Sequence, residues 1–255
     1  MTCAPRRLAR AIGGVVWPVG LLLIGAAGLL ELPSLTVIGF AVVVVGVALF
    51  LLCNQHPDHA PFTVQPPVRG RWIAVKSPAQ KRPSHGTHEL ARASAIDLVH
   101  VPDPSVARRR VRWWPPARPA RRYPAYGQPV LAPGDGIVVA ATGWQRDHWS
   151  RDTPWTLAYL LVELLVRAVL SPFGGRFVLG NRVIVDLGDG VYAVLAHLRR
   201  GSVRVRVGQR VRAGEVLAAC GNSGYTSEPR VHFQLVDHRR PALAAGVPFE
   251  FDRRR

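Results

Sequence analysis

Lysine and paired cysteine are both scarce in this sequence of 255 residues. The three cysteines form neither a CxxC pair nor an even set, so the sequence supports no disulfide framework and no thiol redox motif. Lysine occurs only as Lys76 and Lys81, so nearly all of the positive charge is arginine. Acidic residues are few as well, at 16 against 33 basic residues, which gives a formal net charge of +17.

This charge indicates an anionic partner, such as lipid head groups, wall polymers or nucleic acid. The sequence contains no helix-turn-helix, zinc-finger or RNA-binding signature, so a nucleic-acid partner is not expected. The most basic stretch is 108–122, in which seven arginines accompany Trp113 and Trp114, and its prolines exclude a regular helix. This stretch, Arg108 to Arg122, is either a solvated loop or an anchor on anionic lipid or wall polymer.

Charge is absent from two long apolar runs near the N-terminus, residues 11–30 and 35–53. Each is long enough to cross a hydrocarbon core of about 30 Å, and the four residues between them suit a tight hairpin. A signal peptide would have a shorter apolar stretch and a small-x-small cleavage site. The sequence therefore predicts that residues 1–54 form a hairpin of two transmembrane helices in a lipid bilayer.

The orientation of this hairpin involves a conflict. Three arginines precede the first span and none lies in the turn, so the positive-inside rule places both the N-terminus and the following domain in the cytoplasm. The family resemblance described below requires the opposite side of the cell membrane. Because long domains can translocate against the charge bias, we expect the domain to face outward.

The soluble part begins with a proline-rich linker, expected at 55–70, and continues as one domain over 71–253. Two β-branched runs around Gly-Asp-Gly predict a β-hairpin over 183–195, and strict alternation predicts a strand over 202–207. Residues 155–170 have the composition of a helix, which lies within an expected insertion at about 144–176.

Three polar residues stand out on apolar backgrounds. Asp97 in SAIDLV would be costly to bury without a cation, and His232 in PRVHFQLV and His197 in LAHL lie in strand-like runs. Upstream, PSHGTH supplies His85 and His88. Two histidines and one aspartate with an open fourth position are typical of a catalytic zinc site.

Three motifs in the soluble part carry a more specific signal. They are YAVLAHL, VRVGQRVRAGEVLAACGNSG and the closing PRVHF. With their surroundings, over roughly residues 71–237, they resemble the LytM/lysostaphin-type zinc endopeptidases. The resemblance implies a mainly β fold, an antiparallel, barrel-sandwich-like peptidase domain here carrying an inserted helix, and hydrolysis of peptide bonds in bacterial peptidoglycan with Zn²⁺ as cofactor.

Carried over by position, the resemblance implies His85, Asp97 and His232 as metal ligands, with His88 as the alternative to His85, and His197 as a catalytic histidine. The family places the aspartate closely after the first histidine, whereas Asp97 here follows His85 by 12 residues and His88 by nine. An insertion therefore separates the ligands. His85 is preferred because its Ser-His-Gly context resembles the family's entry to this loop.

A second departure is Arg230, which stands where the closing family motif begins with histidine. Arginine keeps its proton, so it cannot act as a general base, but it can donate hydrogen bonds to an oxyanion. The alternatives are an active enzyme with Arg230 in that role and a degenerate module that binds the cell wall or regulates a partner hydrolase.

Other readings are weaker. The stretch 205–218 also looks like the turn of biotinyl or lipoyl carrier domains, but no lysine lies near its tip. His148, near Asp147 and Asp152, is either part of a second metal site or of a polar loop. Glu228 is a candidate for orienting His232.

Overall fold

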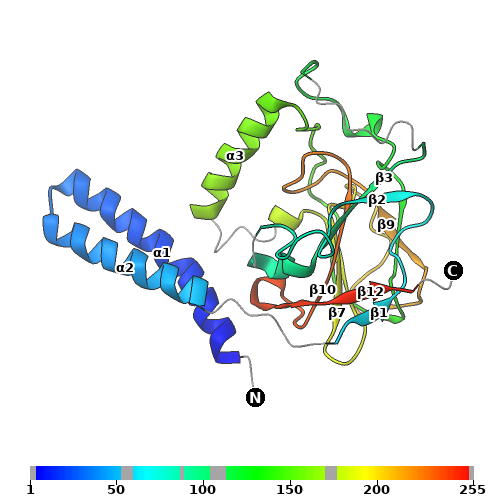
Figure 1. The fold of residues 1–255 in the computed structure, drawn as a ribbon, viewed down its shortest axis with the longest axis horizontal. Coiled ribbons are helices and arrows are strands. Elements are labelled where there is room, and N and C mark those ends of the chain that lie inside the picture. Colours follow the sequence, from blue (N-terminus) through cyan, green and yellow to red (C-terminus); the bar gives the residue numbers. More distant parts are fainter. Residues whose placement is uncertain (1–3, 53–59, 87–88, 104–112, 170–176, 253–255) are drawn as a thin grey trace. The chain divides into compact units, whose positions relative to one another are not determined.

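The computed structural model describes residues 4–52, 60–86, 89–103, 113–169 and 177–252 (Figure 1). The chain divides into two compact units. One comprises residues 1–55 and 163–175, and the other comprises residues 56–162 and 176–255.

The N-terminal unit contains the two apolar helices α1 (Ala4–Leu30) and α2 (Pro33–Leu52), joined by a turn at Glu31 and Leu32. Their apolar windows, Ile12–Leu30 and Pro33–Phe50, have mean hydropathies of 2.0 and 2.4. By length and composition both helices can cross a membrane, although a signal sequence has the same properties.

Glycines allow the backbones of α1 and α2 to approach closely. A Cβ on Gly13 would lie 2.7 Å from Gly46 O, and one on Gly20 would lie 2.7 Å from Gly39 O. Small residues at facing positions are typical of helix pairs packed within a bilayer. The expected hairpin is therefore present as a packed helix pair.

The other unit is built on one antiparallel sheet with strand order β2-β3-β10-β7-β6-β5-β8, and β11 also pairs with β10. Its strands are β2 (Trp72–Lys76), β3 (Ile96–His100), β5 (Gly136–Thr142), β6 (Arg182–Asp186), β7 (Tyr192–Ala196), β8 (Arg210–Val211), β10 (Val231–Val236) and β11 (Gly246–Val247). The expected mainly β, antiparallel fold is confirmed.

Two small sheets complete this unit. Strands β4 (Pro129–Leu131) and β9 (Val216–Ala219) pair antiparallel, and β1 (Phe62–Val64) pairs in parallel with β12 (Phe249–Phe251). Strand β1 lies inside the segment expected to be a linker. The folded unit therefore begins before Arg71, because the backbone of these proline-rich residues is paired with the C-terminal strand.

The central strands are buried on both faces, and alternate residues pack into two different clusters. Phe233 and Leu235 of β10 belong to the larger core cluster, together with Leu195 of β7. Val236 of β10 and Val194 of β7 belong to the smaller one. Since side chains alternate along a strand, His232 and Gln234 lie on the same side as Val236. This double burial explains why His232 stands in an apolar run.

The connections between the strands agree in part with the predictions from the sequence. The predicted hairpin is β6 and β7, with left-handed φ values of 87°, 52° and 71° at Gly188, Asp189 and Gly190. Helix α3 (Pro154–Val169) is the expected insertion between β5 and β6. The prediction of a strand at 202–207 is wrong, because this segment contains no strand. The Arg204 amide donates to Leu217 O, and the chain then turns at Gly208.

Candidate metal centre

Sheet register places Asp97 and His232 directly opposite each other. Strands β3 and β10 are antiparallel neighbours, and His232 is the partner of Asp97 in their ladder. On its other side, His232 is paired with Ala196 of β7, the residue before His197. Three strands that are distant in sequence therefore bring a carboxylate and two imidazoles to one place.

The loop before β3 brings His85 to this place. The Ser84 amide donates to Ala93 O at 3.1 Å, and the Ser84 hydroxyl lies 2.7 Å from Ala95 O. These contacts close the inserted segment on itself immediately before Asp97. The two ends of the insertion therefore lie together, so the long spacing between His85 and Asp97 does not separate their side chains. His88 lies outside the described residues.

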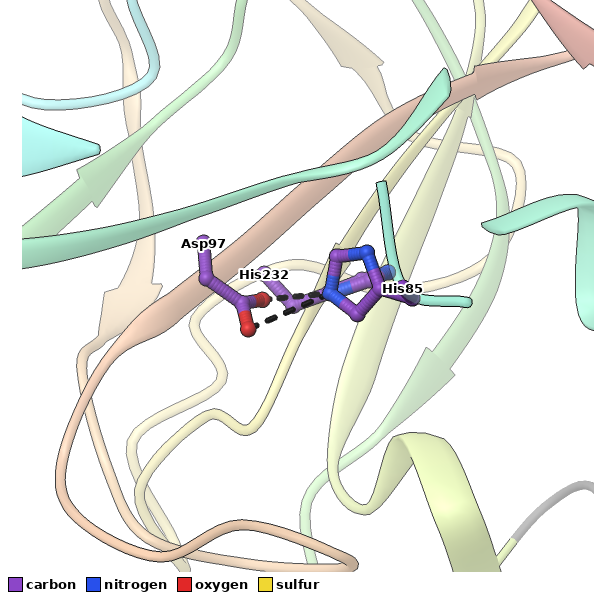
Figure 2. Close-up of side chains that lie close together, drawn as sticks. All are labelled: His85, Asp97 and His232. Atoms are coloured by element: carbon purple, nitrogen blue, oxygen red, sulfur yellow. Dashed lines mark hydrogen bonds and ion pairs between the residues drawn. The ribbon is translucent and has the colours of Figure 1, made fainter. Parts of the chain in front are cut away.

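The side chains of His85, Asp97 and His232 converge, with one ligand atom from each lying within 4.8 Å of the others (Figure 2). His85 Nε2 lies 3.2 Å from Asp97 Oδ2, and His232 Nδ1 lies 2.9 Å from Asp97 Oδ1. The Asp97 and His232 side chains are 1% and 2% exposed. This is the one group of three or more His, Cys, Asp or Glu side chains with such spacing among the described residues.

Hydrogen-bond partners set the tautomer of His232. The Gln234 amide donates to Leu90 O at 2.8 Å, which turns its Oε1 toward His232 Nε2 at 3.1 Å. Because Oε1 can only accept, Nε2 carries the proton. In the neutral ring, Nδ1 then presents a lone pair to the Asp97 carboxylate.

The same reasoning applies to His85. The Ser84 hydroxyl has one proton, which goes to Arg92 O or Ala95 O at 3.0 and 2.7 Å. Toward His85 Nδ1, 2.9 Å away, Ser84 can therefore only accept. His85 Nδ1 carries the proton, and its Nε2 lone pair also faces Asp97.

Two lone pairs and a buried carboxylate pointing at one another require a positive charge among them. The atoms His85 Nε2 and Asp97 Oδ2 are buried without a hydrogen-bond partner among the described residues. Metal-bound histidines characteristically donate their second ring N–H to a fixed acceptor, as both do here. The donor set and its orientation fit a divalent metal ion such as zinc.

Arg230 supplies a second positive charge at the same carboxylate. It immediately precedes β10, and its Nε lies 3.0 Å from Asp97 Oδ2, with the side chain 12% exposed. Its Nη1 donates to Ser227 Oγ at 3.3 Å. Burial raises the pKa of Asp97, but the charge of Arg230 opposes burial and holds the pKa well below its usual range.

Burial keeps His85 and His197 neutral. It lowers the pKa of His85 to about 4, against the opposing attraction of the Asp97 carboxylate. Burial also lowers the pKa of His197, with a further contribution from the charge of Arg230, to well below the ordinary value. A neutral imidazole is the form that binds a metal or accepts a proton.

His197 is held in a left-handed backbone conformation at the end of β7, with φ of 61°. Its amide donates to Leu179 O at 3.0 Å, and its Nδ1–H donates to Ser223 O at 2.9 Å. The Nε2 lone pair is therefore available, and the ring centroid lies 5.7 Å from that of His232. A strained residue fixed from two sides is typical of a functional position.

The remaining candidates have structural roles. Asp147 accepts the Asn222 amide at 2.7 Å, and Asp152 accepts Arg118 at 3.0 Å and the Tyr123 hydroxyl at 2.8 Å. These carboxylates organise a loop and form no second metal cluster with His148 among the described residues.

Glu228 is a candidate from the sequence for orienting His232, but other residues contact the His232 ring nitrogens. Asp97 and Gln234 occupy the two ring nitrogens of His232. Sequence reasoning missed Gln234, although its i, i+2 spacing on a strand puts it on the same face as His232.

Residues 168–243 match the family model described as Peptidase family M23. This range contains His197, Arg230 and His232, whereas His85 and Asp97 precede it.

Two curated relatives are informative. The peptidoglycan DD-endopeptidase ShyA of Vibrio cholerae is 27% identical over 124 residues, which is 48% of this chain and 21% of the relative. The glycyl-glycine endopeptidase ALE-1 of Staphylococcus capitis is 33% identical over 125 residues, which is 49% of this chain and 26% of the relative. The chain thus spans about a fifth to a quarter of the length of these relatives.

Among solved structures, the catalytic domain of the antimicrobial peptidase lysostaphin from Staphylococcus simulans aligns with a TM-score of 0.34 and 19% identity. The alignment covers 61% of this chain and 77% of that domain.

Proposed function

From the premise that the chain carries a peptidase family M23 domain, we propose that it is a zinc metalloendopeptidase that hydrolyses peptide bonds in bacterial peptidoglycan. The substrate class is carried over from the printed names of the relatives, a peptidoglycan DD-endopeptidase and a glycyl-glycine endopeptidase. The observation that carries the proposal is the convergence of the His85 and His232 lone pairs on the Asp97 carboxylate.

In the proposed reaction, His85 Nε2, Asp97 and His232 Nδ1 would hold the zinc ion. When bound, zinc supplies Lewis acidity, which polarises a peptide carbonyl and acidifies a water molecule. Ser84 and Gln234 keep the two ligand histidines in the tautomers that leave these nitrogens free. The protein therefore fixes the donor atoms before the ion arrives, which lowers the cost of ordering them.

His197 is proposed to handle the proton. Its Nδ1–H is committed to Ser223 O, so Nε2 can accept a proton from the attacking water and later deliver it to the leaving amine. Arg230 keeps its proton and is restricted to stabilising negative charge, as on the oxyanion of the tetrahedral intermediate. His197 and Arg230 are thus the proposed catalytic residues.

A second candidate is a module that binds the cell wall, or regulates a partner hydrolase, without cleavage. The observation that favours it is the Arg230–Asp97 ion pair, because a guanidinium can satisfy the buried carboxylate in place of a metal.

The proposed location is the cell membrane, with α1 and α2 as spans and the peptidase domain outside. The basic segment that ends at Arg122 is proposed to contact anionic lipid or wall polymer. In support, Trp113 and Trp114 are 62% and 82% exposed, as membrane-interface side chains are.

The test uses the full chain purified in detergent. Zinc per molecule is measured by elemental analysis, and new amines are counted after incubation with peptidoglycan and with a glycyl-glycine peptide. We expect about one zinc and measurable cleavage in the wild type, and loss of both in Asp97→Asn and His232→Ala. Asp189→Asn, on the exposed β6–β7 turn, is the matched control and should change neither. Zinc retained in both site variants would refute the ligand assignment, and zinc without cleavage would favour the binding module.

A further inference from the structure

Arg230 and the metal site share one oxygen atom. Asp97 Oδ2 faces His85 Nε2 at 3.2 Å and Arg230 Nε at 3.0 Å, while Oδ1 faces His232 Nδ1 at 2.9 Å. The carboxylate that would bind a metal is therefore already in contact with a permanent cation.

The position of Arg230 follows from the strand. It lies two residues before His232, so continuation of the strand period directs both side chains to the same side. The guanidinium is also held at its far end, where Nη1 donates to Ser227 Oγ at 3.3 Å. The strand position and this hydrogen bond together direct Nε of Arg230 toward Asp97.

The contact between Arg230 and Asp97 changes the charge that an entering metal ion meets. Asp97 is 1% exposed, and a carboxylate buried to this degree needs a counter-charge or several hydrogen bonds. Arg230 provides a permanent positive charge in direct contact with this carboxylate, with its Nε 3.0 Å from Asp97 Oδ2. A divalent ion entering beside Asp97 meets a carboxylate whose charge is already neutralised, and it meets the repulsion of a guanidinium.

We propose that Arg230 is an internal counter-cation that competes with the metal ion for Asp97. It stabilises the buried carboxylate when no metal is bound, and it weakens metal binding relative to the same chain with a neutral residue at position 230. Metal occupancy then depends on the concentration of available metal, and the metal-free domain remains folded. This inference rests on the proposed metal centre.

Competition predicts opposite effects on two measurable quantities. Removing the charge of Arg230 tightens metal binding, because the entering ion no longer meets a repelling charge. The same change destabilises the metal-free protein, because Asp97 loses its counter-charge. A merely structural role for Arg230 would weaken metal binding and stability together.

The test compares the full chain with Arg230→Gln in detergent, by zinc titration against a chromophoric chelator and by thermal unfolding with and without zinc. Glutamine keeps a donor without the charge. Loss of one unit charge close to a divalent ion, at the effective dielectric of a protein, should tighten zinc binding about tenfold or more. The zinc-free variant should unfold at a lower temperature than the wild type. Arg206→Gln, an exposed arginine in 202–207, controls for net charge and should change neither quantity.

Two further variants keep the test decisive if the glutamine variant does not fold without zinc. Arg230→His should bind zinc more tightly than the wild type, whereas Arg230→Lys, which keeps the charge, should not. Unchanged or weaker zinc binding by the neutral variants, in a protein whose wild type binds zinc, would overturn the competition and leave the metal centre intact. If wild type and variants all fail to bind zinc, the metal centre and this inference are both wrong.

Discussion

Gln234 offers the sharpest test of how the protein prepares its metal site. Its side chain is fully buried, donates to Leu90 O at 2.8 Å and accepts from His232 Nε2 at 3.1 Å. Replacement by leucine keeps the approximate volume and removes both interactions. His232 Nε2–H and Leu90 O are then left without these partners in a buried environment.

The magnitude follows from these two orphaned groups. Each unpaired buried group costs about 1–3 kcal/mol, so Gln234→Leu should lower the free energy of unfolding of the zinc-free protein by about 2–6 kcal/mol. His232 is also no longer held in the tautomer that frees Nδ1. Loss of such an orienting partner typically weakens metal affinity by about 10–100-fold.

Zinc affinity by chelator competition and urea unfolding with EDTA measure the two effects separately. Thr153→Val is the matched control, because it removes the partly buried hydrogen bond from Thr153 Oγ1 to Pro116 O at 2.8 Å. It should lower stability and leave zinc affinity unchanged. Gln234→Glu retains an acceptor for His232 and should keep more zinc affinity than the leucine variant. Wild-type zinc affinity in a folded Gln234→Leu protein would refute the tautomer argument.

Two other predictions concern pH and topology. His85 has a pKa of about 4 in the folded state against 6.5 for the free side chain, so the folded state binds its proton more weakly. Its contribution to the stability of the metal-free protein is complete above pH 6.5 and is lost as the pH falls to 4, by up to about 3 kcal/mol; a urea midpoint that stays constant from pH 7 to 4.5 would contradict this. For topology, a C-terminal tag should be digested by protease added outside intact cells, and its protection would place the domain in the cytoplasm.

Local patterns in the sequence predicted several local structures, although the alternating run at 202–207 forms no strand. The uncharged runs predicted the two N-terminal helices, and the Gly-Asp-Gly turn predicted the hairpin of β6 and β7, because both depend on neighbouring residues. The pairing of β1 with β12 could not be predicted, since it joins residues almost 190 positions apart. Proline in that segment indicated a linker, but its backbone is part of a ladder.

The site, like the fold, was predicted only in part. Motif resemblance selected His85, Asp97 and His232, and the structure places these three side chains together, while their role as ligands remains a prediction. The contact of Arg230 with Asp97 was not foreseen, because the sequence shows only that a histidine position holds arginine. Where its guanidinium points depends on the pairing of β10 with β3.

That pairing links the core to the chemistry of the site. A shift of one residue between β10 and its neighbours would exchange the two faces of the strand and carry His232 and Gln234 into the position of Phe233. Phe233 resists such a shift because its ring packs against Phe249 and Phe251 of β12, with centroids 4.9 and 5.8 Å apart. The aromatic cluster on one face of β10 therefore stabilises the register that holds His232 opposite Asp97 on the other face, so a core residue whose side chain points away from the site helps to determine its geometry.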